Sequence, residues 1–191
     1  YGSRQDTTND EVLEIARLSE AHGYSTFFTG ESWGRDALTL LTFVACNTAT
    51  LKLGTGILPI YSRTPSLIAQ SIASLDSISG GRAILGLGTS GKIVIENWHG
   101  VKFKNPIANT EAYVAIIRQA LSGQRVDYSA GDFSLRGFRL NINPVQAEIP
   151  IYLASLGPRN LELTGKVANG WIPIWVHYQH LRSLKNAVIL S

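Results

Sequence analysis

The sequence predicts an α/β protein in which helices cover a parallel sheet. Two observations lead to this fold class. Helical patterns alternate with short apolar runs along most of the 191 residues, an order typical of parallel strands joined by helices. The apolar runs show no polar alternation, so they fit strands that are buried on both faces. Periodicity alone leaves open whether the sheet closes into a barrel or stays open as a doubly wound sheet.

The elements follow in order along the chain. A capping box of Thr8 and Glu11 marks the first helix, which ends near Gly23. Asp36 is the expected N-cap of a second helix, and Pro65 opens a third that ends near residue 79. The remaining elements are helices near residues 111–121 and over 158–168, strands over 25–31, 51–60, 80–89, 150–155 and 170–175, and a polar hairpin around 127–137.

Composition describes an ordinary globular domain, with 45% hydrophobic and 16% charged residues. The net charge of +3 comes from scattered Lys and Arg without a basic run, so we expect no nucleic-acid partner. The single cysteine, Cys46, excludes an intramolecular disulfide framework and suits a reducing cytoplasm, where we expect the protein to act. No apolar stretch is long enough to span a bilayer and no signal peptide is evident, so we expect no membrane partner.

The chain begins with Tyr1 and contains no Met. We therefore expect it to be part of a longer gene product. We treat residues 1–191 as a single, partial domain.

Three glycines after an apolar run match the spacing G-x-G-x-x-G: Gly86, Gly88 and Gly91. A dinucleotide-binding turn with this spacing would need a helix that opens at the third glycine. Gly100 and Pro106 argue against a helix that begins at Gly91, and the first two glycines belong to the strand. We expect these glycines to serve close strand packing and a strand-end loop instead.

Ligands of parallel α/β proteins bind beyond the carboxyl ends of the strands, and three candidate residue types stand there. Glu31 ends the first readable strand and is our candidate for proton transfer. Gly56 follows the next strand, where glycine permits close approach to a ligand, and Arg63 is a candidate for binding an anionic group. None of these patterns predicts a metal site.

Two strand-end loops have the small residues and free amides that phosphate binding requires. The first consists of Gly88, Thr89, Ser90 and Gly91. The second, Ala154, Ser155, Leu156 and Gly157, runs into a helix whose first residue is Pro158. A helix N-terminus lined by small residues is a sound phosphate cradle.

Residues 30–41, 51–91, 96–100 and 149–175 resemble the luciferase-like monooxygenase superfamily. The likeness covers nearly all of residues 10–175, in order and at family spacing. The most similar branch is the group of oxidoreductases that use the deazaflavin coenzyme F420 in place of FMN. The resemblance implies a TIM-type (β/α)8 barrel, of which only the second to sixth strands can be assigned. Since such a barrel needs about 250 residues, we expect it to be incomplete.

The same resemblance implies roles for individual residues. A non-proline cis peptide at the end of the family's third strand matches Gly56 and Ile57. The phosphate loops match Gly88–Gly91 and Ala154–Pro158. A ring-edge or substrate position matches Glu31 and Ser32, where many relatives carry a histidine that this chain lacks. Arg63, Lys92 and Arg159 are candidates for binding the acidic tail of the coenzyme.

The predicted activity is hydride transfer between a deazaflavin coenzyme and an organic substrate. One alternative is an FMN-dependent two-component monooxygenase. A second alternative is a flavin-binding relative without catalysis. The expected partners are a small-molecule substrate and a second copy of the chain in a homodimer.

Overall fold

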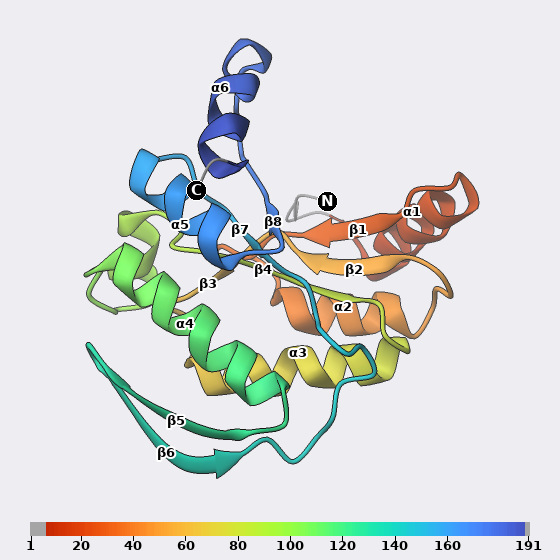
Figure 1. Cartoon of the computed structure of the whole chain (residues 1–191). Coiled ribbons are helices and arrows are strands. Elements are labelled where there is room, and N and C mark those ends of the chain that lie inside the picture. The colour runs from red at the N-terminus through yellow and green to blue at the C-terminus, as the bar shows by residue number, and fades with distance from the viewer. Residues whose placement is uncertain (1–6, 190–191) are drawn as a thin grey trace.

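A parallel sheet forms the centre of the protein (Figure 1). The structure is a computed structural model and describes residues 7–189. The sheet consists of β1 (Thr26–Thr29), β2 (Lys52–Thr55), β3 (Leu58–Pro59), β4 (Ala83–Gly88), β7 (Ile151–Leu153) and β8 (Gly170–Trp171). All pairs are parallel, in the order β1-β2-β4-β7-β8, and β3, which follows β2 along the chain, also pairs with β4.

The strands lie in the sheet in the same order as in the chain. A doubly wound sheet reverses its order at a switch point, whereas a barrel places each strand beside the preceding one. The observed order is therefore that of a barrel wall, which settles the choice that periodicity left open. With β2 and β3 counted together, the wall has the five positions expected for the second to sixth strands.

The helices alternate with these strands. They are α1 (Asn9–Ala21), α2 (Ala37–Ala45), α3 (Pro65–Ser79), α4 (Pro106–Leu121), α5 (Pro158–Val167) and α6 (Tyr178–Ile189). Helices α2, α3 and α4 lie side by side along one side of the sheet, whereas α6 projects from the body and contacts α5 (Figure 1). None of the helices within residues 7–189 is long and apolar enough to cross a membrane.

Local sequence signals set the helix starts. Both halves of the predicted capping box at Thr8 are present, and the Asp36 carboxylate accepts the N–H of Thr39 at 2.7 Å. Helices α3, α4 and α5 each open on a proline, which suits the first turn. Helix α4 accordingly begins at Pro106, about one turn before the expected start near Glu111.

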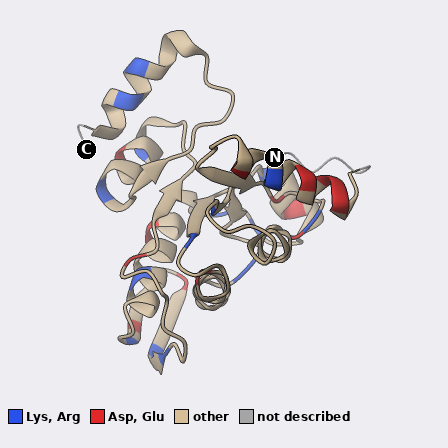
Figure 2. Ribbon diagram, turned by 90° about the vertical axis from the view of Figure 1, so that its right-hand side faces the viewer, with Lys and Arg blue, Asp and Glu red and all other residues tan. Residues whose placement is uncertain are grey.

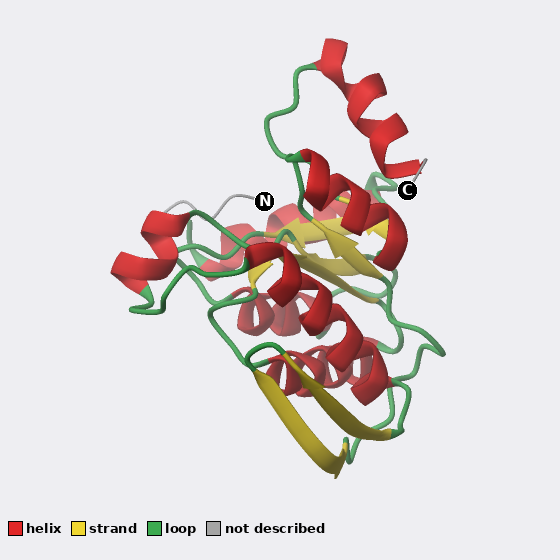
Figure 3. Ribbon diagram, turned by 60° about the vertical axis from the view of Figure 1, so that its left-hand side comes forward, coloured by secondary structure: helices red, strands yellow, loops and turns green. Residues whose placement is uncertain are grey.

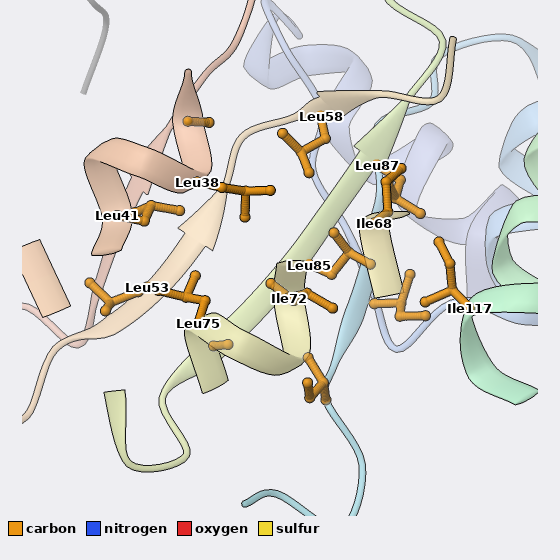
Figure 4. Packing of buried hydrophobic residues seen from close by; sticks show 14 of the residues in the cluster. Leu38, Leu41, Leu53, Leu58, Ile68, Ile72, Leu75, Leu85, Leu87 and Ile117 are labelled. Atoms are coloured by element: carbon orange, nitrogen blue, oxygen red, sulfur yellow. The ribbon is translucent and has the colours of Figure 1, made fainter. Parts of the chain in front are cut away.

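Aliphatic side chains pack between the sheet and α3 (Figure 4). Leu53 and Leu85 contribute from the strands, and Ile68 and Ile72 from the helix, all with 0% exposure. All six residues of β4 are buried, which confirms for this strand that the apolar run is covered on both faces.

A short helical segment after Gly91 corrects one expectation. The chain turns helical at residue 92 and continues as the π-helical segment η1 (Val94–Trp98). The carbonyl of Gly91 accepts the N–H of Ile95 at 3.1 Å. Gly100, with φ of +66°, ends the segment. Gly100 and Pro106 therefore limit the length of this helix, whereas the sequence analysis predicted that they exclude a helix here.

Arg82, at the amino end of β4, has a structural role and binds backbone carbonyl groups, not the nearby carboxylate of Asp76. Its guanidinium donates to the carbonyl oxygens of Ala45 and Leu51, each at 2.9 Å. The carbonyl at the end of α2 attracts a cation there. The carboxylate of Asp76 instead accepts the backbone N–H groups of Val145 and Gln146.

The polar stretch after α4 forms the expected antiparallel hairpin, β5 (Arg125–Ala130) and β6 (Phe133–Arg139). It lies outside α3 and α4, away from the parallel sheet (Figure 3). The hairpin therefore belongs to an outer layer and takes no part in the barrel wall.

Candidate cofactor site

A cavity of about 500 Å³ opens where the parallel strands end. Loops that follow β1, β2, β4, β7 and β8 all reach it. It is lined by Gly30, Glu31, Ser32, Gly56, Ile57, Gly88, Thr89, Ser90, Gly91, Ala154, Ser155, Leu156, Gly157, Asn160, Ile172 and Ile174. Ligand pockets of comparable proteins have volumes of about 300–1,000 Å³, so the cavity has room for a cofactor-sized group.

Most of the predicted site residues meet in this cavity. Twelve of the fourteen predicted residues line it, and the two that do not are Arg63 and Pro158. Four lining residues were not among the predicted ones: Gly30, Asn160, Ile172 and Ile174. Asn160 lies in the first turn of α5, just behind the predicted cradle, so the helix start could have indicated it.

Glycines let the strand ends converge on the cavity. A Cβ on Gly86 would lie 1.9 Å from the carbonyl oxygen of Thr55, and a Cβ on Gly88 would lie 3.1 Å from the side chain of Ile57. The hydroxyl of Thr55 both donates to the carbonyl of Gly86 and accepts its N–H, at 2.8 Å each. The first two glycines of the motif therefore serve close strand packing, as predicted. The peptide bond between Gly56 and Ile57 is cis, which confirms that expectation.

The backbone N–H groups of the two predicted phosphate loops are available to bind an anion. Within residues 7–189, the N–H groups of 89–91 and 155–157 donate to no protein acceptor. Gly157 is the N-cap of α5 and supplies no side-chain cap. Backbone N–H groups at a helix N-terminus have no intrahelical partner and favour a bound anion. These two loops therefore form a cradle that fits a phosphate.

Hydrogen bonds of Ser155 hold the second loop in place. Ser155 is 5% exposed, and its hydroxyl lies 2.8 Å from that of Thr164 on α5. The indole N–H of Trp171 donates to the carbonyl of Ser155 at 2.8 Å. These contacts fix the loop beside the cavity, while the N–H groups of residues 155–157 have no protein acceptor.

Glu31 lines the cavity at the end of β1, with both carboxylate oxygens engaged. Its Oε1 accepts from Arg63 Nη1 at 2.5 Å, and its Oε2 accepts from Arg63 Nη2 at 2.9 Å and from the N–H of Ala37 at 3.0 Å. The side chains of Glu31 and Arg63 are 9% and 15% exposed. In this arrangement Glu31 is a fixed anion at the end of β1, and Arg63 binds the protein's own carboxylates and not the cavity.

Asp36 completes the cluster, because Arg63 Nη2 also pairs with its carboxylate. The hydrogen bonds that Arg63 donates to Glu31 raise the pKa of Arg63. Burial raises the pKa of Asp36, but hydrogen bonds from Thr39 and the charge of Arg63 outweigh it, so that the pKa of Asp36 is lowered. Two carboxylates thus share one guanidinium.

Among the described residues that line the cavity, Glu31 alone carries a charge. Lys92 and Arg159 directly follow the two cradle loops, and both are exposed. Within the same part of the chain, no group of three or more His, Cys, Asp or Glu could hold a metal ion. The site is therefore a cavity lined by backbone amide donors and by one carboxylate held by Arg63.

A family model described as luciferase-like monooxygenase matches residues 2–186. The chain belongs to the luciferase-like monooxygenase family. The 5,10-methylenetetrahydromethanopterin reductase of Methanolobus tindarius is 34% identical over 184 residues, covering 94% of this chain and 55% of that protein. The F420-dependent glucose-6-phosphate dehydrogenase of Mycobacterium tuberculosis (strain CDC 1551 / Oshkosh) is 29% identical over 176 residues, covering 85% of this chain and 52% of that protein.

A solved luciferase-like structure matches almost the entire chain. The coenzyme F420 dependent tetrahydromethanopterin reductase from Methanopyrus kandleri superposes with a TM-score of 0.90 at 25% identity, over 98% of this chain and 58% of that one. The fold is therefore a partial TIM-type barrel of the luciferase-like family. The chain spans about half the length of the curated relatives it matches.

Proposed function

We propose that this luciferase-like chain binds the deazaflavin coenzyme F420 in the cavity at the strand ends, as part of an oxidoreductase that transfers a hydride to or from an organic substrate. The observation that carries the proposal is the double cradle of unpaired N–H groups at residues 89–91 and 155–157. The relatives whose names include coenzyme F420 favour a deazaflavin over FMN as its occupant.

Each wall of the cavity has a distinct task in this proposal. The two loops bind the coenzyme phosphate through backbone N–H groups, and the N-terminus of α5 adds its dipole. Lys92 and Arg159 lie where they can attract the acidic tail. When bound, a deazaflavin supplies the ring that exchanges a hydride. Glu31 and Ser32 line the cavity after β1, and Ile172 and Ile174 add apolar surface after β8.

Glu31 acts in this proposal as a fixed negative charge that orients the substrate. Arg63 and the N–H of Ala37 occupy both of its oxygens, so holding its position is better supported than releasing a proton. The use of an organic small-molecule substrate and the formation of a homodimer stay predictions.

A second candidate is a deazaflavin-binding chain without catalysis. Five strand positions of the barrel are present, and the chain spans about half of its curated relatives. Turnover by the 191-residue chain separates the two candidates.

Titration with coenzyme F420 and with FMN, followed by coenzyme fluorescence, tests the proposal. Gly157→Pro is the informative variant, because Gly157 has φ of −76° and ψ of 148°, which proline adopts, and the change removes one N–H of the cradle. A hydrogen bond to a charged group contributes about 1.5–3 kcal/mol, so affinity for coenzyme F420 should fall by roughly tenfold or more.

Gly157→Ala is the matched control, because it keeps the N–H and its Cβ meets no heavy atom within 4 Å. We expect it to bind several times more tightly than Gly157→Pro. Equal affinity of the two variants would overturn the cradle, and tighter binding of FMN than of coenzyme F420 would overturn the choice of a deazaflavin.

A further inference from the structure

A second concave surface lies on the outer layer, between the hairpin and the helices α3 and α4. The groove has a volume of about 480 Å³. Figure 3 shows the hairpin on the far side of these helices from the parallel sheet, so the groove is separate from the cavity at the strand ends. The residues that line the groove include Gln70, Val126, Leu135, Arg136, Phe138 and Arg139.

The floor of the groove is apolar and incompletely covered. Val126 is directly opposite Phe138 in the hairpin register, so the two side chains share a face. Val126 is 6% exposed, whereas Phe138 is 84% exposed. The residues of α3 that line the groove, Ser66 and Gln70, are polar and do not fill the space over Phe138. The apolar surface at Phe138 is therefore left open beside α3.

The rim of the groove is positively charged. Arg136 and Arg139 line it, and no acidic residue does. Arg139 is also directly opposite Arg125, and two like charges in one register position repel each other. Within residues 7–189, none of the three arginines forms an ion pair. Figure 2 shows basic residues on this hairpin in blue.

The nearby carboxylates are engaged elsewhere. Asp127 accepts the N–H of Gly137 at 2.9 Å, and Asp132 pairs with Lys104 at 2.9 Å. Charged side chains on edge strands also prevent aggregation, which accounts for exposed arginines by themselves. It does not account for an open apolar floor directly beside them.

We propose that this groove binds an amphipathic organic anion, in which a carboxylate or phosphate head is joined to an aliphatic or aromatic body. The guanidinium groups of Arg136 and Arg139 bind the head, since arginine donates paired hydrogen bonds to both carboxylate and phosphate. The body lies on Val126, Leu135 and Phe138. The volume is in the range of small-molecule pockets, about 300–1,000 Å³.

Decanoate and decyl phosphate are the probes for a test with the 191-residue chain labelled with ¹⁵N. Each is titrated while the backbone amide resonances are followed. We expect at least one probe to shift the amides of residues 134–141 most strongly. Decylammonium, which has the same body and a positive head, should bind at least about tenfold more weakly, because like charges repel.

The double variant Arg136→Gln and Arg139→Gln should weaken binding of the anion by at least about tenfold. Arg182→Gln, on the exposed face of α6, is the matched control and should leave affinity unchanged. All three positions are on the surface, and the melting temperature of each variant checks folding. The proposal is overturned by shifts confined to the strand-end loops, by equal binding of decylammonium, by an undiminished affinity of the double variant, or by no binding of either anion.

Discussion

Removing the guanidinium of Arg63 tests how the wall of the cavity is built. Arg63→Met keeps the length of the side chain but removes its hydrogen bonds to Glu31 and Asp36. The carboxylate of Glu31, at 9% exposure, then keeps only the N–H of Ala37 at 3.0 Å. The variant therefore leaves a nearly buried negative charge without its cation.

The expected loss follows from this geometry. Leaving one member of a buried ion pair alone lowers the free energy of unfolding by about 3–5 kcal/mol. Asp36 is 42% exposed, so its pairing contributes at most about 1 kcal/mol. Because the open cavity lets water reach Glu31, we expect the lower end, about 3 kcal/mol in total.

Urea denaturation of the wild type and of Arg63→Met, Glu31→Gln and the double variant measures this value. For a chain of this size, about 3 kcal/mol corresponds to a fall in Tm of about 6–12 °C. Glu31→Gln removes the charge but keeps an acceptor for Ala37, so it should lose less, about 1–2 kcal/mol. The double variant should be more stable than the sum of the single losses by at least about 1 kcal/mol, because no charge is left unpaired.

Strict additivity of the two changes, or a loss below about 1 kcal/mol for Arg63→Met, would refute the account of Glu31 as a charge held by Arg63.

Three further changes test other parts of the fold. Asp76 is fully buried and its carboxylate accepts four hydrogen bonds, so Asp76→Ala should lower the free energy of unfolding by at least about 3 kcal/mol in urea. Gly86→Ala places a Cβ 1.9 Å from a backbone oxygen and should cost about 3 kcal/mol or more, whereas Gly91→Ala, whose Cβ meets nothing within 4 Å, should leave the Tm nearly unchanged. Hydrogen bonds, chiefly from Thr50, lower the pKa of Glu20 from 4.5 to about 2. Glu20 therefore stabilises the fold fully above about pH 4.5, and this contribution is lost as the pH falls toward 2. The free energy of unfolding should depend less on pH across this range in Glu20→Gln than in the wild type, and an equal pH dependence of the two would contradict the lowered pKa of Glu20.

Signals that act over a few residues were readable from the sequence. The capping box at Thr8, the N-cap at Asp36 and the proline that opens α5 all lie where the sequence predicted. Both cradle loops were also predictable, because strand ends and helix starts are local features and parallel strands bring their carboxyl ends to one edge. Most of the cavity wall is therefore encoded in short segments.

Contacts between distant residues were not readable in this way. Glu31 and Arg63 are 32 positions apart, and their pairing depends on the register of β1 against β2. Arg63 was accordingly expected to bind a ligand, whereas it binds the protein. Arg82 likewise lies near Asp76 along the chain but donates to the carbonyl at the end of α2. Sequence spacing indicates which groups are near an edge, but register decides which of them pair.

The central claim is that the N–H groups of residues 89–91 and 155–157 bind the phosphate of a deazaflavin coenzyme. Amide chemical shifts of the ¹⁵N-labelled chain, followed during titration with coenzyme F420, test it most directly. We predict that the largest shifts occur at these two loops and saturate together with coenzyme fluorescence. Saturable binding that leaves both loops unshifted would contradict the claim.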